Sequence, residues 1–517
     1  MTSSNAVMAG ALLSLLACTD TTAVVGKFND DHPGRVPIVT RPATDAAPEA
    51  STNSAMAGST AIPSAADGGE TDACAQADCA AEDGGAPPSV AEPNASRQVT
   101  PQIAIEGGTR DEFCNGHGPV LQLVNPGAGT SECNGGITRR LFSYALCACH
   151  NLSLEGAAFT LDAFDSRQGP YVSGESGAAV GVNNLFQPAG KNNELRGSLI
   201  IAGREPLAVM NGLSVVGDLE TNAEFQVGSQ LQVGRDVWAD ADLKLADGGM
   251  FSVGRDLIQT PGRFADPALM VGGVRRERAI EVQPPCACEP ASQLQISALV
   301  KQAQLDNDNA EAKVANDTFQ ALLLTDAAEL ACGRLALQGV SINVSTIAIS
   351  VPKRTALFID GDFVINTLAT VAVDPGASGE LDILISGNLV VQGSAFLGST
   401  SRPSALRLYV AGQVDLGANI QLAGQLYAPN AQLALPGLTD SYGAFVANDI
   451  HTYGMQHLHY DRAITEASDC SAPPSACDDC DQCPGGLACM NGSCSPCQRD
   501  ADCCAPATCD AGKCRAP

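Results

Sequence analysis

The chain has 517 residues, of which only 4% are aromatic, and its 57 acidic and 29 basic residues give a formal net charge of −28. A core with so few rings must be filled by Val, Ile, Leu and Ala, a composition that favours many short strands over large helices. The acidic balance, with no compensating Lys/Arg cluster, argues against nucleic acid as a partner, because the phosphate backbone would be repelled.

Residues 1–17 are expected to be an export signal. Ala6–Ala17 is an apolar run, shorter than the roughly 20 residues of a membrane-spanning helix but long enough for a signal sequence, and it ends Leu15-Leu16-Ala17-Cys18. This ending resembles the bacterial lipobox, and the resemblance implies cleavage after Ala17 and lipid on Cys18. Residues 1–11 contain no Lys or Arg, although a signal normally begins with positive charge. An apolar leader with a chance cysteine is the alternative.

The cysteine count gives a second indication of export. Of 21 cysteines, lipidation of Cys18 would leave an even number, and abundant cysteine in an exported acidic chain indicates disulfides formed in an oxidising compartment. In a reducing cytosol the same residues would have to bind metal, but the chain has only six His. The cysteines expected in disulfides are Cys74, Cys79, Cys114, Cys133, Cys147, Cys149, Cys286, Cys288, Cys332, Cys470, Cys477, Cys480, Cys483, Cys489, Cys494, Cys497, Cys503, Cys504, Cys509 and Cys514.

Residues 18–101 are rich in Ala, Pro, Ser, Thr, Gly and Asp and show little periodicity. Such a segment cannot bury enough apolar surface to offset the entropy of ordering it, so we predict a disordered tether. A flexible chain of this length reaches on the order of 50 Å. Cys74 and Cys79 are close enough in sequence to close a small loop within it.

Residues 102–470 are predicted to form a right-handed parallel β-helix-like body. Short apolar segments punctuated by glycine recur with spacings of 17 and 20 residues, then 26 and 25, at Val216–Leu219, Val233–Val237, Val253–Leu257, Ile359–Phe363, Ile385–Leu389 and Val410–Val414. Repeats of this period stack so that the coils share one core, and glycine fits where a side chain would clash. A β-sandwich with glycine-rich turns is the alternative.

A helical insertion is expected at about 280–324, because Ile296, Leu299, Val300 and Ala303 have the spacing of one helix face. We expect it to pack across the β-helix or to cap one end. Residues 471–517 are predicted to be a separate cysteine-rich module. Cys489–Cys494 and Cys509–Cys514 enclose equal spacings, which indicates a degenerate duplication stabilised by disulfides.

Several segments together resemble a known but uncharacterised family. They are Leu426–Ala431, Tyr442–Val446, His459–Asp461, Phe113–Gly116 and the two Cys-Ala-Cys pairs. They resemble a β-helical domain of bacterial surface lipoproteins and pilus-associated proteins, over roughly residues 105–470. The resemblance implies a β-helix at the cell surface and carries no catalytic residues with it. The tail resembles short cysteine-rich repeats of exported proteins and, through its vicinal Cys503-Cys504, knottin-like modules.

Three clusters are candidate metal sites. His457 and His459 point the same way on a strand, so both imidazoles could bind one ion, with His451 or Asp461 as third ligand; surface or turn residues are the favoured interpretation. Asp306 and Asp308, in an Asp-Asn-Asp-Asn run, have oxygen ligands that suit weak calcium binding, against a solvated loop or helix cap. The Cys477, Cys480 and Cys483 run resembles a zinc motif, but disulfides are favoured there. No cofactor is expected otherwise.

Catalytic motifs are not apparent in the sequence. The Gly-x-Ser-x-Gly elbow, His-Glu-x-x-His and the nucleotide-binding glycine motifs are missing. Asp360 and Asp362 flank Gly361 and could act as a glycosidase pair, although Asp beside glycine is also common turn chemistry.

The sequence therefore predicts a non-catalytic surface lipoprotein with a structural or adhesive role. It would be held to the membrane by its lipid, and Thr19, in place of a retention Asp, favours the outer membrane or cell surface. The first alternative is a module that binds polysaccharide or another envelope protein, for which the clustered rings Tyr409, Tyr427, Tyr442, Tyr453 and Tyr460 would be stacking platforms. The second is a carbohydrate-active enzyme.

Overall fold

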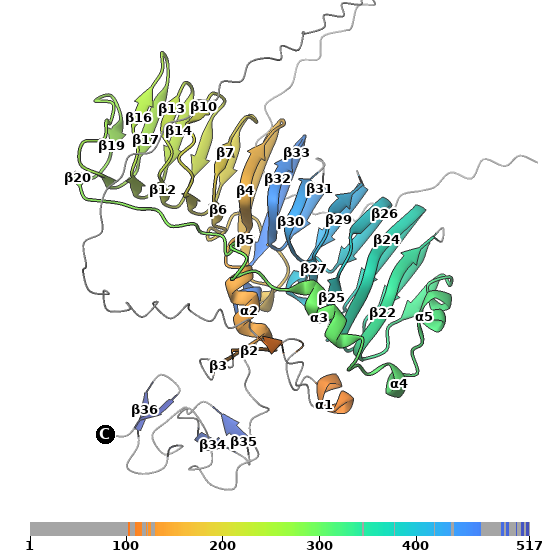
Figure 1. The fold of residues 1–517 in the computed structure, drawn as a ribbon. Coiled ribbons are helices and arrows are strands. Elements are labelled where there is room, and N and C mark those ends of the chain that lie inside the picture. Colours follow the sequence, from red (N-terminus) through yellow and green to blue (C-terminus); the bar gives the residue numbers. More distant parts are fainter. Residues whose placement is uncertain are drawn as a thin grey trace, which may run out of the picture. The chain divides into compact units, whose positions relative to one another are not determined.

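The computed structural model describes residues 102–103, 109–115, 120, 122–125, 130–343, 346–376, 378–417, 419–435, 439–466, 488–490, 493–495, 503, 508–510 and 513–515. These residues are mainly β. A 27-stranded sheet and a three-stranded sheet of β10, β13 and β16 together wind into a parallel β-solenoid of about 12 turns (Figure 1). The predicted parallel β-helix is thus confirmed, and the β-sandwich alternative is excluded.

The first half of the solenoid lies between residues 146 and 277. Its strands are β4 (Leu146–Leu154), β5 (Ala158–Phe164), β6 (Val180–Val182), β7 (Leu185–Gln187), β8 (Asn193–Leu195), β9 (Leu199–Ile201), β10 (Leu207–Val209), β11 (Leu213–Val215), β12 (Leu219–Thr221), β13 (Phe225–Val227), β14 (Gln230–Val233), β15 (Val237–Ala239), β16 (Leu243–Leu245), β17 (Met250–Val253), β18 (Leu257–Gln259), β19 (Met270–Val271) and β20 (Arg275–Glu277).

The second half lies between residues 327 and 461. Its strands are β21 (Ala327–Glu329), β22 (Gly333–Ile342), β23 (Ile347–Ser350), β24 (Arg354–Asp374), β25 (Glu380–Ile385), β26 (Leu389–Gly398), β27 (Leu406–Val410), β28 (Val414–Leu416), β29 (Asn419–Ala423), β30 (Gln425–Leu435), β31 (Thr439–Tyr442), β32 (Phe445–Thr452) and β33 (Met455–Asp461).

The remaining elements are short. They are β1 (Gln102–Ile103), β2 (Gln122–Asn125) and β3 (Thr130–Cys133), which form an antiparallel sheet; helices α1 (Arg110–Cys114), α2 (Asn134–Leu141), α3 (Ile296–Ala303), α4 (Asn309–Ala312) and α5 (Asn316–Leu322); 3-10 turns η1 (Ser166–Gln168), η2 (Pro403–Ala405) and η3 (Arg462–Glu466); and two C-terminal hairpins, β34 (Ala488–Met490) with β35 (Ser493–Ser495) and β36 (Thr508–Asp510) with β37 (Lys513–Arg515). Among the described helices, none is both long enough and apolar enough to cross a membrane.

The coils do not stack in chain order. The chain starts the solenoid in its middle, at β4 and β5, and builds outward to β20. It then restarts at the opposite end, at β21 and β22, and builds back until β32 pairs with β4 and β33 with β5, all in parallel (Figure 1). We call the contact of β32 and β33 with β4 and β5 the junction. It makes one continuous rod from two separately built halves.

One apolar column runs from β22 to β18 and crosses the junction. Ladder pairing stacks one inward-facing residue from each coil, and every member is buried: Leu335, Leu357, Ile383, Leu408, Leu426, Phe445, Leu146, Val180, Leu199, Leu219, Val237 and Leu257. Burying each such side chain contributes about 1.5–3 kcal/mol. The column explains why Val, Leu and Ile suffice in a chain with few aromatics.

Residues 278–295, here called the strap, return the chain from β20 across the outside of the coils to α3 (Figure 1). Asn222 and Asn183 fasten it with paired hydrogen bonds. The Asn222 amide donates to Val282 O at 2.8 Å and accepts from Val282 N at 3.1 Å. The Asn183 amide makes the same pair with Cys286, at 3.0 Å each. In the predicted insertion, the residues before Ile296 form no helix, and the first helix, α3, begins at Ile296.

The strap and α3 explain the outward-facing apolar residues beneath them. Leu384, Tyr409 and Tyr427 occupy one outward column of the ladder, yet each is no more than 1% exposed. The Tyr427 hydroxyl accepts the N–H of Leu294 at 3.2 Å. As predicted, the insertion packs across the solenoid.

The insertion also caps one end, because α4 and α5 lie against edge strand β22 (Figure 1). Side chains replace the missing neighbouring strand there. Asp308 accepts the N–H of Arg334 at 2.7 Å, and the Asn309 amide both accepts from Ala336 N and donates to Ala336 O. Gln304, Asn316 and Gln320 continue the same pairing at Leu337, Gln338 and Gly339. Edge-strand groups that would otherwise need another strand are thereby satisfied.

Candidate functional site

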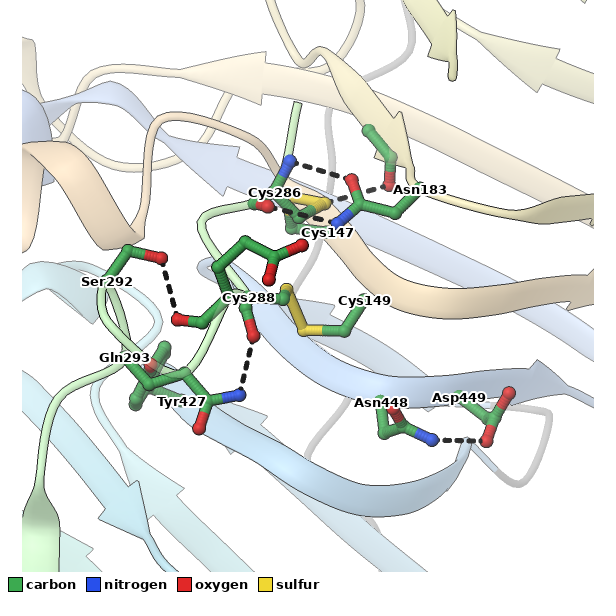
Figure 2. Close-up of a disulfide and its surroundings, with 12 residues drawn as sticks. Cys147, Cys149, Asn183, Cys286, Cys288, Ser292, Gln293, Tyr427, Asn448 and Asp449 are labelled. Carbon is green, nitrogen blue, oxygen red and sulfur yellow. Dashed lines mark hydrogen bonds between the residues drawn. A yellow bond between two sulfur atoms is a disulfide. The ribbon is translucent and has the colours of Figure 1, made fainter. Parts of the chain in front are cut away.

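Two disulfides fix the strap to the junction. Cys147 and Cys149 lie on β4, the strand that both halves share, and bond to Cys286 and Cys288 respectively (Figure 2). Each bridge spans 139 residues of sequence. The two Cys-Ala-Cys pairs that stood out in the sequence are thus the two sides of one double staple.

A third disulfide, Cys114–Cys332, spans 218 residues and fixes α1 to the start of β22. Beside it Phe113 is fully buried, with the guanidinium carbons of Arg334 and Arg354 at 4.5 and 4.7 Å from its ring centroid. This is cation–π geometry. Burial lowers the pKa of both arginines, against the opposing effect of nearby carboxylates.

The other expected bridges fall mostly outside the described residues. Cys503 is disulfide-bonded, and Cys489 and Cys509 lie opposite Cys494 and Cys514 in the two hairpins. The side chains of Cys133, Cys489, Cys494, Cys509 and Cys514 are not described. The positions wholly outside the described residues are Cys18, Cys74, Cys79, Cys470, Cys477, Cys480, Cys483, Cys497 and Cys504.

The junction also holds a histidine–carboxylate pair. His459 on β33 lies directly opposite Asp162 on β5, and its Nδ1 donates to Asp162 Oδ1 at 2.7 Å. The Tyr171 hydroxyl and the N–H of Gly174 donate to the other oxygen, at 2.7 and 3.1 Å. Burial by itself would raise the pKa of Asp162, but the His459, Tyr171 and Gly174 hydrogen bonds together lower it.

Aromatic rings enclose this pair. Tyr171 and Tyr442 lie with ring centroids 3.9 and 4.8 Å from the imidazole. Burial, and then the Asp162 carboxylate, raises the pKa of Tyr171. His459 Nε2 is 4.0 Å from Asp440, a half-exposed carboxylate. Because His459 itself is only 7% exposed, the pair is enclosed at the contact between the two halves of the solenoid.

The other predicted metal ligands, on β33 and β32, have different partners. His457 Nδ1 meets the Thr160 hydroxyl at 2.6 Å. Asp461 is fully buried and accepts hydrogen bonds from Ser166 and Ser404. His451 stacks on Tyr453. Within the described part of the chain, no group of three or more His, Cys, Asp or Glu side chains is placed to hold a metal ion.

The acidic candidates lie in structural roles. Asp308 belongs to the end cap at β22, beside Asp306 in the same segment. Asp360 accepts the Ser386 hydroxyl at 3.0 Å, and Asp362 accepts the N–H of Asn388 at 2.7 Å. Both carboxylates therefore join one coil to the next, as expected of turn chemistry.

Most of the tyrosines predicted as stacking platforms are buried. Tyr409, Tyr427, Tyr442 and Tyr460 are buried, and only Tyr453 of that set is exposed, at 46%. Burial raises the pKa of Tyr427 and of Tyr442. These five rings therefore do not form one exposed aromatic surface.

The outer surface carries a ladder that the sequence analysis did not identify. Asp218, Asp236 and Asp256, here called the Asp ladder, occupy equivalent turns, and each accepts the N–H of the next coil at 2.9–3.0 Å. Arg235, Arg255 and Arg276 pair with them across coils at 3.3–3.7 Å. The sequence feature that could have predicted the Asp ladder is the repeated Val-Gly-Arg-Asp at Val233–Asp236 and Val253–Asp256. Exposed pairs of this kind contribute little stability individually.

Among the hollows of the described residues, two that open to solvent stand out. The larger, about 510 Å³, lies beside β7 and β10, and its lining includes Glu155, Pro188, Pro206 and Met210. The smaller, about 290 Å³, adjoins the Cys114–Cys332 bridge and is lined partly by Lys353 and Glu380.

Comparison with known proteins identifies one region. Residues 288–467 match a domain of unknown function, DUF7305. The match covers α3 and the second half of the solenoid, and it ends just after the junction strand β33. The DUF7305 region is thus a β-solenoid that pairs, through β32 and β33, with coils outside the match. No curated protein and no solved structure matched the chain.

Proposed function

We propose that this chain is an exported bacterial surface lipoprotein, anchored through Cys18, whose solenoid has a structural or adhesive role. The observation that carries the proposal is the set of three disulfides between segments 139 and 218 residues apart. Stable disulfides of this kind belong to oxidising compartments. A membrane lipid is its first partner, and the outer membrane or cell surface is its proposed location.

The structural role is supported by how the solenoid is closed. The buried column, the double staple and the His459–Asp162 pair each connect parts of the chain that are distant in sequence, and together they favour a rigid rod. The long outer face presents repeated polar turns, such as the Asp ladder. A regular rigid surface suits assembly or adhesion, and catalysis forms no part of the proposal.

Mass analysis of the native protein tests anchor and compartment together. We expect a mature chain that begins at acylated Cys18 and has no cysteine that reacts with an alkylating reagent before reduction. A Cys18→Ser variant should be released from the membrane fraction while its solenoid still melts at the wild-type temperature. An unacylated native chain with reduced thiols would refute the proposal.

The second candidate function is binding of a surface polysaccharide or envelope protein. The hollow of about 510 Å³ between β7 and β10 favours it, with exposed Met210 on its rim. A glycan array probed with the full chain, alongside an Ala208→Glu variant that fills the hollow with charge, tests this. Binding that the variant loses supports the candidate; an array without signal refutes the polysaccharide form of it.

A further inference from the structure

The two ends of the solenoid are finished differently. At one end, α4, α5 and amide side chains cover edge strand β22. At the other end, β19 pairs only with β17 and β20 only with β18 in the described part of the chain. Strands β19 and β20 therefore form an edge with main-chain groups directed outward.

Hydrogen bonds show which groups face outward. Leu257 N–H donates to Val274 O, and Arg278 N–H donates to Gln259 O. Because backbone groups alternate in direction along a strand, the N–H and C=O groups of Arg275 and Glu277 point away from β18. They have the geometry that an added strand requires.

The side chains at this edge combine positive charge with apolar surface. Arg275, Arg276 and Arg278 are exposed and outnumber Glu277, which lies between them; Arg276 pairs with Asp256 at 3.3 Å and Arg275 donates to Leu269 O at 2.7 Å, on a chain whose net charge is −28. Met270 and Val274 beside them are 54% and 47% exposed. Val274 occupies the position that Asp218, Asp236 and Asp256 occupy in the earlier coils. The Asp ladder therefore ends at Asp256, which accepts the N–H of Val274.

We infer that this edge binds an extended segment of a partner polypeptide, one that alternates acidic and apolar side chains and adds as a strand beside β20. Its carboxylates lie on the outer face of the added strand, the face that carries Arg276 and Arg278, and its apolar residues lie on the other face, toward the end of the buried column at Leu257. The inference concerns an interaction surface and holds whether or not the chain is lipid-anchored.

A second copy of the chain fits this edge poorly. Two open ends brought together would place one set of arginines against the other, which is unfavourable. The opposite end of a second copy has its edge strand β22 already satisfied by Asp308, Asn309 and their neighbours. Charge complementarity thus selects an acidic strand from another protein.

Fluorescence anisotropy with the oxidised full-length chain tests the inference. The probe is a labelled octapeptide of alternating Glu and Val, and the comparison peptide replaces every Glu with Lys. We expect the Glu peptide to bind at least 10-fold more tightly and to weaken as NaCl is raised, because charge attraction is screened. Equal binding of the two peptides, or no binding of either, would overturn the inference.

Two variants separate the main-chain and charge contributions. Glu277→Pro removes an outward N–H and should weaken the Glu peptide at least 10-fold, whereas Glu277→Ala should not; circular dichroism and the melting temperature check that both are folded. Arg276→Gln with Arg278→Gln should bring the two peptides within about 3-fold of each other. Peptide binding that survives Glu277→Pro, or dimerisation of the chain that Glu277→Pro abolishes, would contradict the acidic-strand assignment.

Discussion

His459 on the last coil donates a 2.7 Å hydrogen bond to Asp162 on the first coil, across 297 residues of sequence. Both residues are buried, and Tyr171 completes the pairing of the carboxylate. A buried polar pair between two strands forms its hydrogen bond in only one register, so it stabilises that register over the others. It helps to select the register in which the second half meets the first.

Removing the imidazole should therefore destabilise the chain. With His459→Ala, Asp162 keeps Tyr171 and Gly174 as donors but loses its third, so the free energy of unfolding should fall by about 1–3 kcal/mol. Urea denaturation followed by circular dichroism measures this. The matched control is His150→Ala on β4, whose side chain is 53% exposed and whose loss should cost under about 0.5 kcal/mol. Equal effects of the two substitutions would argue against a special role for His459.

The same carboxylate predicts an acid dependence of stability. The hydrogen bonds to Asp162 lower its pKa in the folded state, whereas an unfolded Asp has a pKa of about 3.9. Its contribution is thus fully present above that value and is lost as pH falls through the lower folded pKa. Melting temperatures of wild type and Asp162→Asn should differ most near neutral pH and converge below about pH 4. A gap that stays constant down to pH 2 would be inconsistent with this linkage.

The disulfides predict strong non-additivity. Cys147–Cys286 and Cys149–Cys288 close loops of the same length in the same place, so either bridge alone removes most of the loop entropy of the unfolded chain. Changing one pair to Ser should cost about 1 kcal/mol or less from the lost loop closure, whereas changing both pairs should cost about 4–5 kcal/mol. Denaturation of the three variants decides this, and simple additivity of the two pairs would contradict it.

Glycine punctuation was enough to predict the stacked parallel coils, because the period of a solenoid is local in sequence. The order of the coils was not predictable, since nothing in the repeats indicates that Phe445 comes to lie against Leu146. The double staple had a signal in the matched Cys-Ala-Cys pairs, but sequence spacing cannot show which cysteines meet. The run Asp306–Asn309 suggested a calcium site because it is rich in oxygen ligands. The structure uses Asp308 instead to accept the N–H of Arg334 on edge strand β22, and the sequence does not distinguish the two roles.

The glycines that repeat along the solenoid give the last prediction. A Cβ on Gly254 would overlap the carbonyl oxygen of Gly234 in the preceding coil, whereas a Cβ on Gly228 would meet only the flexible end of Met210, at 2.8 Å from its sulfur. Neither glycine has a positive φ, so the pair isolates close approach from backbone strain. Gly254→Ala must push two coils apart and should cost about 1–3 kcal/mol, but Gly228→Ala should cost less than about 1 kcal/mol because the Met210 side chain can move aside. Thermal denaturation of both variants measures the difference. If the two variants were equally stable, the coils could move apart at Gly234 and Gly254 with little loss of stability, and the prediction would be wrong.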